Sequence, residues 1–115
     1  MKLMNRRTFA LALSLGAASL LIPSFAMAED HLAEAISHTK EAIDHGKQGH
    51  AKVLVTHAEA ALKHADAAEK ASDNEHTKEG ITHLKEAIET GEKGHAEEAT
   101  KHAEAALGHL EQAAK

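Results

Sequence analysis

Cysteine, tryptophan and tyrosine are absent from this 115-residue chain. The two phenylalanines, the three methionines and the single proline all lie before residue 29. Without cysteine there is no disulfide, no thiolate ligand and no cysteine nucleophile. From residue 29 onward the chain also lacks a thioether ligand for Cu(I) and an aromatic ring on which a ligand could stack. These absences leave imidazole and carboxylate as the main side-chain groups that could bind a metal ion.

The first 28 residues resemble a secretory signal peptide. Basic residues stand at positions 2, 6 and 7, an apolar run covers residues 9–22, and Ala26-Met27-Ala28 is a small-x-small cleavage motif. The run is short for a membrane span, so we expect cleavage rather than an uncleaved anchor. We therefore predict a leader at 1–28, a mature chain of residues 29–115, and a periplasmic protein exported across the inner membrane and free of the membrane once the leader is removed.

Two details of this leader allow more than one interpretation. Residues 5–9, Asn-Arg-Arg-Thr-Phe, resemble the motif of twin-arginine leaders, which carry folded cargo. Paired basic residues also occur in ordinary leaders, so both export routes stay open. Ser24-Phe25-Ala26 is a second small-x-small motif, which leaves the cleavage position open as well.

The charge of the mature chain excludes one class of partner. All 18 acidic residues but only ten of the 13 basic residues follow position 28, which gives a net charge of −8 with neutral histidine. Nucleic acid phosphates require a basic surface, so we expect no nucleic acid partner. An acidic surface instead suits cations.

An internal duplication organises the mature chain. Residues 31–70 align with residues 76–115 without a gap, and 21 of the 40 aligned positions are identical. Each repeat contains a helical pattern, a Gly-x-x-Gly segment (46–49 and 91–94) that we expect to break the helix, and a second helical pattern. Two helical hairpins in series predict an all-α fold, an up-down-up-down four-helix bundle. Residues 72–74, Ser-Asp-Asn, would join the hairpins and cap the third helix.

Apolar residues at helical spacing predict the buried face of each helix. In the first helix this spacing places Ala35 and Ala42 at the flank of the seam, with His31 and His38 beside them toward solvent. Because alanine buries little apolar area, we expect a bundle of marginal stability. The expected seams are Leu32, Ile36, Thr39 and Ile43; Leu54, Ala58, Ala61, Ala65 and Ala68; Thr77, Ile81, Leu84 and Ile88; and Ala99, Ala103, Ala106, Leu110 and Ala113.

Eleven histidines are spaced mostly by seven residues and mirrored about the two glycine segments. Seven residues are two helical turns, so histidines at this spacing share one face. In an antiparallel hairpin, mirrored positions lie at the same height and form rungs of two imidazoles, which are common transition-metal ligands. We expect the rung nearest the first turn to be the closest. The rungs are His31/His64, His38/His57, His45/His50, His76/His109 and His83/His102, with His95 left over because Thr90 occupies its partner position.

Glutamates near these histidines supply a second kind of ligand. Consecutive histidines on one helix are separated by about 10.5 Å of rise, too far to share an ion. A second ligand must therefore come from three or four residues away or from the neighbouring helix. The candidate carboxylates are Glu34, Glu41, Glu79, Glu86 and Glu98. Together with all eleven histidines, they form the predicted set of metal ligands.

The sequence is similar to the small metal-binding protein family of bacterial periplasms. The resemblance covers the mature chain and rests on His-x-x-Glu-Ala-Ile (38–43 and 83–88), Gly-x-x-Gly-His (46–50 and 91–95) and His-Ala-Glu-Ala-Ala-Leu (57–62 and 102–107). It implies a four-helix bundle that binds several divalent metals, copper prominently. The family's ligand roles would fall on the histidines of these motifs, and Thr90 departs from the pattern.

We therefore predict a protein that buffers, sequesters or carries divalent transition metals, Cu(II) foremost and Ni(II) or Zn(II) next, as a monomer. The alternative is a structural or partner-binding helical module with a pH-responsive histidine surface. We expect no enzyme, because the chain has no His-Glu-x-x-His motif, no pair of helical Glu-x-x-His motifs of the di-iron type and no nucleophile-base set. Haem binding is disfavoured by the missing Cys-x-x-Cys-His motif and aromatics.

Overall fold

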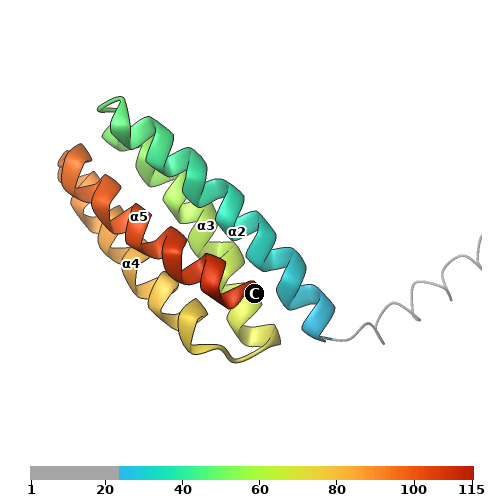
Figure 1. Ribbon diagram of the computed structural model, residues 1–115. Helices are drawn as coiled ribbons and strands as arrows, with labels where there is room; N and C mark the ends of the chain where they lie inside the picture. Colours follow the sequence, from blue (N-terminus) through green and yellow to red (C-terminus); the bar gives the residue numbers. More distant parts are fainter. Residues whose placement is uncertain (1–23) are drawn as a thin grey trace, which may run out of the picture.

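Four helices form an antiparallel bundle in the computed structural model, which describes residues 24–115. They are α2 (Ser24–Lys47), α3 (Ala51–Ala71), α4 (Glu75–Glu92) and α5 (Ala96–Ala113). The chain runs up and down through them in order, so that α2 and α3 form one side of the bundle and α4 and α5 the other (Figure 1). The predicted fold class is confirmed.

The predicted leader lies mostly outside the described residues. Its last five residues, 24–28, belong to the first turns of α2, and both predicted cleavage motifs fall there. The leader and its removal therefore stay predictions. Among the described residues, no helix combines the length and the apolar character needed to cross a membrane.

Small side chains line the centre of the bundle. The fully buried residues include Leu54, Leu84 and Leu110 and a series of alanines from all four helices. Thr39 is also completely buried, and its hydroxyl donates to the carbonyl of Ala35 at 2.7 Å, which satisfies the polar group inside the core. The expected seams of α3 and α5 coincide with buried residues, except that Ala113 is only partly buried.

The expected seams of α2 and α4 need a correction. Ala35 and Ala42 are fully buried at the centre of the contact rather than at its flank, whereas Ile36 is only partly buried. In α4 the buried positions are Thr77, Gly80, Leu84, Ala87 and Gly91, and Ile81 and Ile88 pack at the sides. The reason is steric: small residues at the centre of the contact let the helix axes approach, and the larger isoleucines then fill the flanks.

The two glycines of each turn have different roles. Gly49 and Gly94 follow the helices with φ values of 81° and 83°, the left-handed conformation expected of a helix-ending glycine. The Gly-x-x-Gly pattern predicts that Gly46 and Gly91 break their helices, and this prediction is wrong. Both residues lie inside α2 and α4 and are buried. They allow close packing instead, because a Cβ at Gly91 would lie 2.6 Å from Cγ2 of Val55.

Replacing Gly46 with alanine is expected to destabilise the bundle. The added Cβ would clash with Oγ1 of Thr100 and lie 2.6 Å from Cδ1 of Leu54. Overpacking of this kind costs about 1–3 kcal/mol, and each kcal/mol lowers the melting temperature of a domain this size by about 4–8 °C. Gly108→Ala is the matched control, because nothing lies within 4 Å of its Cβ position and alanine favours a helix by up to about 1 kcal/mol. Thermal melts of both variants should shift in opposite directions, and a stabilised Gly46→Ala protein would contradict the packing described.

The linker between the hairpins is fixed by a cap and an ion pair. The Asn74 side chain accepts hydrogen bonds from the backbone amides of His76 and Thr77, at 2.8 and 3.4 Å, which confirms the predicted cap. Lys78 donates to Asp73 across 2.7 Å. This hydrogen bond lowers the pKa of Asp73 and raises the pKa of Lys78. The cap and the ion pair therefore connect the start of α4 to the linker that precedes it.

Candidate metal sites

The mirrored histidines lie side by side in both hairpins, where the two helices of each hairpin meet at the surface. The predicted rungs are thus confirmed, but the expected order is wrong, because His45/His50 is among the widest pairs. His50 is the N-cap residue of α3, with non-helical dihedral angles of −94° and 76°, so the helix does not set the direction of its ring. Ring centroids are separated by 5.3 Å in His31/His64, 6.0 Å in His38/His57, 6.2 Å in His45/His50, 5.7 Å in His76/His109 and 6.3 Å in His83/His102.

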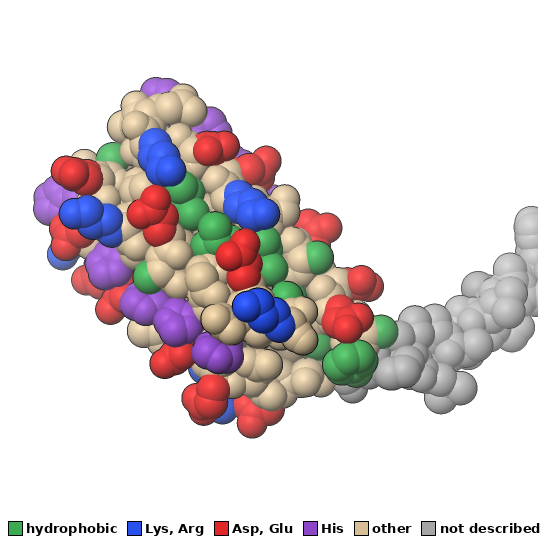
Figure 2. Space-filling model, viewed as in Figure 1, with side chains coloured by type: hydrophobic (Ala, Val, Ile, Leu, Met, Phe, Trp, Pro, Cys, Tyr) green, Lys and Arg blue, Asp and Glu red, His purple; other side chains and the backbone are tan. Residues whose placement is uncertain are grey.

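Neighbouring rungs also contact one another, which joins the rings into two ladders. His38 stacks on His64 with ring centroids 5.7 Å apart, and His45 stacks on His57 at 5.4 Å. The first ladder therefore contains six histidines. The second contains four, linked by the His83/His109 contact at 5.4 Å, and ends at Thr90. Figure 2 shows histidines in a row along the flank formed by α4 and α5, with carboxylates beside them.

At equivalent positions of the two hairpins, one glutamate contacts both rings of a rung. Oε1 of Glu41 is 3.4 Å from Nδ1 of His38 on its own helix and 3.2 Å from Nδ1 of His57 on α3. Oε1 of Glu86 has the same position in the second hairpin, 3.2 Å from Nδ1 of both His83 and His102. The duplication has thus preserved a three-residue cluster of two imidazoles and one carboxylate.

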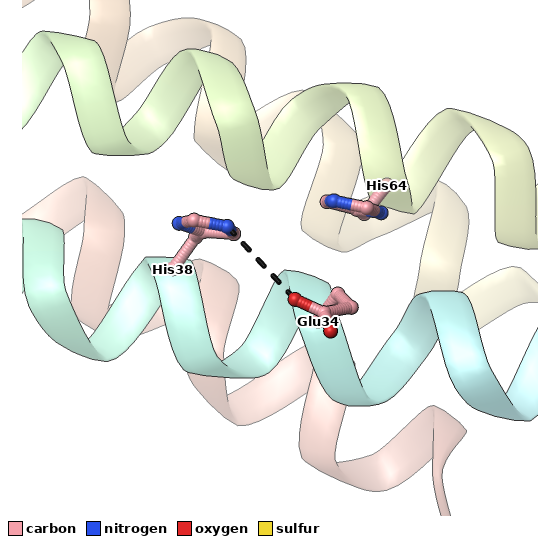
Figure 3. A group of neighbouring side chains, drawn as sticks. All are labelled: Glu34, His38 and His64. Carbon is pink, nitrogen blue, oxygen red and sulfur yellow. Dashed lines mark ion pairs between the residues drawn. The ribbon is translucent and has the colours of Figure 1, made fainter.

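Two further clusters lie toward the open ends of the hairpins. Oε1 of Glu79 lies 3.8 Å from Nδ1 of His76 and 3.1 Å from Nδ1 of His109. In the first hairpin, Glu34 pairs with His38 and not with His31, and His64 completes the group (Figure 3). In each of the four clusters, one ligand atom per residue lies within 4.8 Å of the others. The sites are therefore preassembled from both helices of a hairpin.

The distances and the unpaired nitrogens fit a transition metal ion. Two nitrogens bound to one ion at about 2.0–2.1 Å in a tetrahedral or square arrangement lie about 2.8–3.4 Å apart. The Nδ1 atoms are 3.0 Å apart in His31/His64 and 3.5 Å in His76/His109. Nδ1 of His38, His45 and His83 is buried without a hydrogen-bond partner. Since an unsatisfied buried group costs about 1–3 kcal/mol, an ion at these nitrogens would remove a penalty.

Eleven of the sixteen predicted ligands belong to the four clusters, and no other described residue joins them. The sequence spacing identified the glutamates as ligands because each lies three or four residues from a histidine on its own helix. It did not show that Glu41, Glu79 and Glu86 also contact a histidine on the opposite helix. That signal was present in the antiparallel register, which places each of these carboxylates beside both imidazoles of one rung. Five predicted ligands lie outside the clusters: His31, His45, His50, His95 and Glu98. His31 pairs with His64, and His45 pairs with His50. Nδ1 of His95 lies 3.8 Å from Oε1 of Glu98.

Comparison with known proteins agrees with this geometry. No curated protein matches the chain. The model of the family described as Small metal-binding protein matches residues 6–113, nearly the whole length. The resemblance noted in the sequence motifs is confirmed, and the chain belongs to the small metal-binding protein family.

Proposed function

We propose that this protein binds several divalent transition metal ions in the periplasm, Cu(II) foremost, and buffers, sequesters or carries them. Membership of the small metal-binding protein family supports metal ions as ligands in general. The observation that carries the proposal is the cluster of Glu41 with His38 and His57, repeated as Glu86 with His83 and His102. The carboxylate contacts both imidazoles in each repeat, although 19 of the 40 aligned repeat positions differ.

The donor atoms support the choice of metal. Imidazole suits copper, nickel and zinc, whereas Mg²⁺ and Ca²⁺ prefer sites made of oxygen ligands only. Each cluster supplies two imidazoles and one carboxylate, and the described chain offers no thiolate that would favour Cu(I). Cu(II) stands highest in the general order of affinities for such ligands, with Ni(II) and Zn(II) below it.

The exposure of the ligands supports a buffering or carrying role rather than permanent retention. The histidine side chains of the Glu41 and Glu86 clusters are 25–32% exposed, and the glutamates about half exposed. Ions at such sites can exchange with other ligands in solution, because the side chains that hold them are partly exposed. The four clusters, two in each hairpin, then bind several ions with moderate affinity.

Calorimetric titration with Cu(II), Ni(II), Zn(II) and Mg²⁺, combined with intact-mass spectrometry, tests the proposal. We expect several Cu(II) ions per chain, weaker Ni(II) and Zn(II) binding, and none of Mg²⁺. The double variant Glu41→Gln/Glu86→Gln should weaken Cu(II) binding at these two clusters by tenfold or more, because each loses its one carboxylate ligand, and even loss of a residue that only orients a ligand costs about 10–100-fold. Glu59→Gln/Glu104→Gln is the matched control, since both residues occupy equivalent repeat positions outside the clusters.

Absence of Cu(II) binding to the folded protein would overturn the proposal and favour the alternative, a helical module with a pH-responsive surface. The periplasmic location is checked separately. Cell fractionation should place the protein in the periplasm, and mass spectrometry of that fraction should find a chain that begins at Glu29.

A further inference from the structure

His38 is the one residue that belongs to two of the four clusters in the described chain. It joins Glu41 and His57 on one side and Glu34 and His64 on the other. The other ten cluster residues each belong to one group. The two groups of the first hairpin therefore meet at a single imidazole ring.

The two clusters use opposite edges of this ring. Nδ1 of His38 faces Glu41, with 3.4 Å to Oε1, and this nitrogen is buried and has no hydrogen-bond partner. Nε2 faces Glu34, with 4.0 Å to Oε1. Figure 3 shows the nitrogen that pairs with Glu34 on the side toward His64 and the other nitrogen on the far side of the ring.

We propose that His38 bridges two metal ions, one on each ring nitrogen, so that the first hairpin holds a dinuclear site. The inference rests on the proposed function and specifies how these clusters take up their ions. The ring of a neutral imidazole carries one N–H, and this proton passes to solvent when the second ion binds. Glu41 and His57 complete the ligands of the first ion, and Glu34 and His64 those of the second. With bonds of about 2.0 Å at each nitrogen, the ions lie about 6 Å apart.

The second hairpin provides an internal comparison. His83 corresponds to His38, and its Nδ1 faces Glu86 in the same way. Glu79, which corresponds to Glu34, lies instead between His76 and His109, at 3.8 and 3.1 Å from their Nδ1 atoms. The two clusters of this hairpin thus share no residue, and His83 would serve one ion only. The orientation of a single glutamate separates the bridged hairpin from the unbridged one.

Copper content and the electron paramagnetic resonance of the full Cu(II)-loaded chain test this assignment. Two Cu(II) ions joined through one imidazolate couple magnetically, so the resonance signal should account for fewer ions than the copper measured by mass spectrometry. His38→Ala should lower the bound copper by two ions and remove this shortfall. His83→Ala, the matched control, should lower the bound copper by one ion and leave the shortfall unchanged. Circular dichroism checks that both variants stay helical.

A second pair of variants keeps His38 in place. Glu34→Gln should reduce the coupling by weakening the second ion, whereas Glu79→Gln should leave it intact. A resonance signal that accounts for all the copper in the loaded parent protein would overturn the bridge but not metal binding itself. Loss of only one ion in both histidine variants would do the same. Failure to bind any copper would remove the proposed function and the bridge together.

Discussion

Saturating Cu(II) is expected to raise the melting temperature of the protein by about 10–20 °C or more. The core is built mainly from alanine, with only three fully buried leucines, so the apo bundle buries little apolar area for its size. Each cluster requires ligands from two helices and exists only when a hairpin is folded. An ion present at a hundredfold excess over its Kd then stabilises the folded state by about 2.7 kcal/mol per site.

Differential scanning calorimetry with and without Cu(II) measures this shift. At about 4–8 °C per kcal/mol for a domain of this size, one occupied site already gives the expected rise, and further sites add to it. Mg²⁺ at the same concentration is the control and should leave the transition unmoved. A melting temperature that does not respond to Cu(II) would show that folded and unfolded chains bind the ion equally, as a histidine-rich random chain would.

The bundle itself could be predicted because its sequence signals agree with one another. The duplication, the alanine-rich helical patterns and the Asn74 cap all indicate two hairpins in series, and the structure has them. The wrong predictions concern small residues, which were not expected at the centre of the helix contacts. Ala35 and Gly46 looked like flanking or helix-breaking residues, but small residues occupy the centre of the helix contacts because they allow close approach.

The site was predictable to the level of helix faces but not of rotamers. Mirror positions about each turn identify the five rungs, since an antiparallel hairpin fixes which residues lie at equal height. Side-chain torsions decide which histidine each glutamate contacts. Glu34 and Glu79 occupy equivalent positions, yet one turns toward the following histidine on its helix and the other toward the preceding one. No spacing rule separates these two orientations, which is why His38 could be recognised as a shared ligand only in three dimensions.

Metal binding should weaken by about a thousandfold per site between pH 7.5 and pH 5. Each cluster contains two imidazoles, and an ion must displace the proton from any imidazole that is protonated. For ordinary imidazole, whose pKa is about 6.5, lowering the pH to 5 reduces the share of free base by a factor of about 30. Two such ligands together correspond to about 10³, or about 4 kcal/mol. Carboxylates contribute little to this change, because their usual pKa of about 4.3 lies below the range.

Protons bind the free ligands and not the liganded ones, so acid favours release of the ion. The metal-induced rise in melting temperature should therefore decline below about pH 6.5 and be lost by about pH 5. Cu(II) titrations at half-unit steps between pH 5 and 7.5 measure the slope of affinity against pH. A slope near two protons per ion at the acidic end supports two imidazoles per site. Full stoichiometry and unchanged affinity at pH 5 would instead assign the ions to the carboxylates alone. Glu41→Gln/Glu86→Gln would then abolish binding at its two clusters, and replacement of the histidines of those clusters would leave it intact.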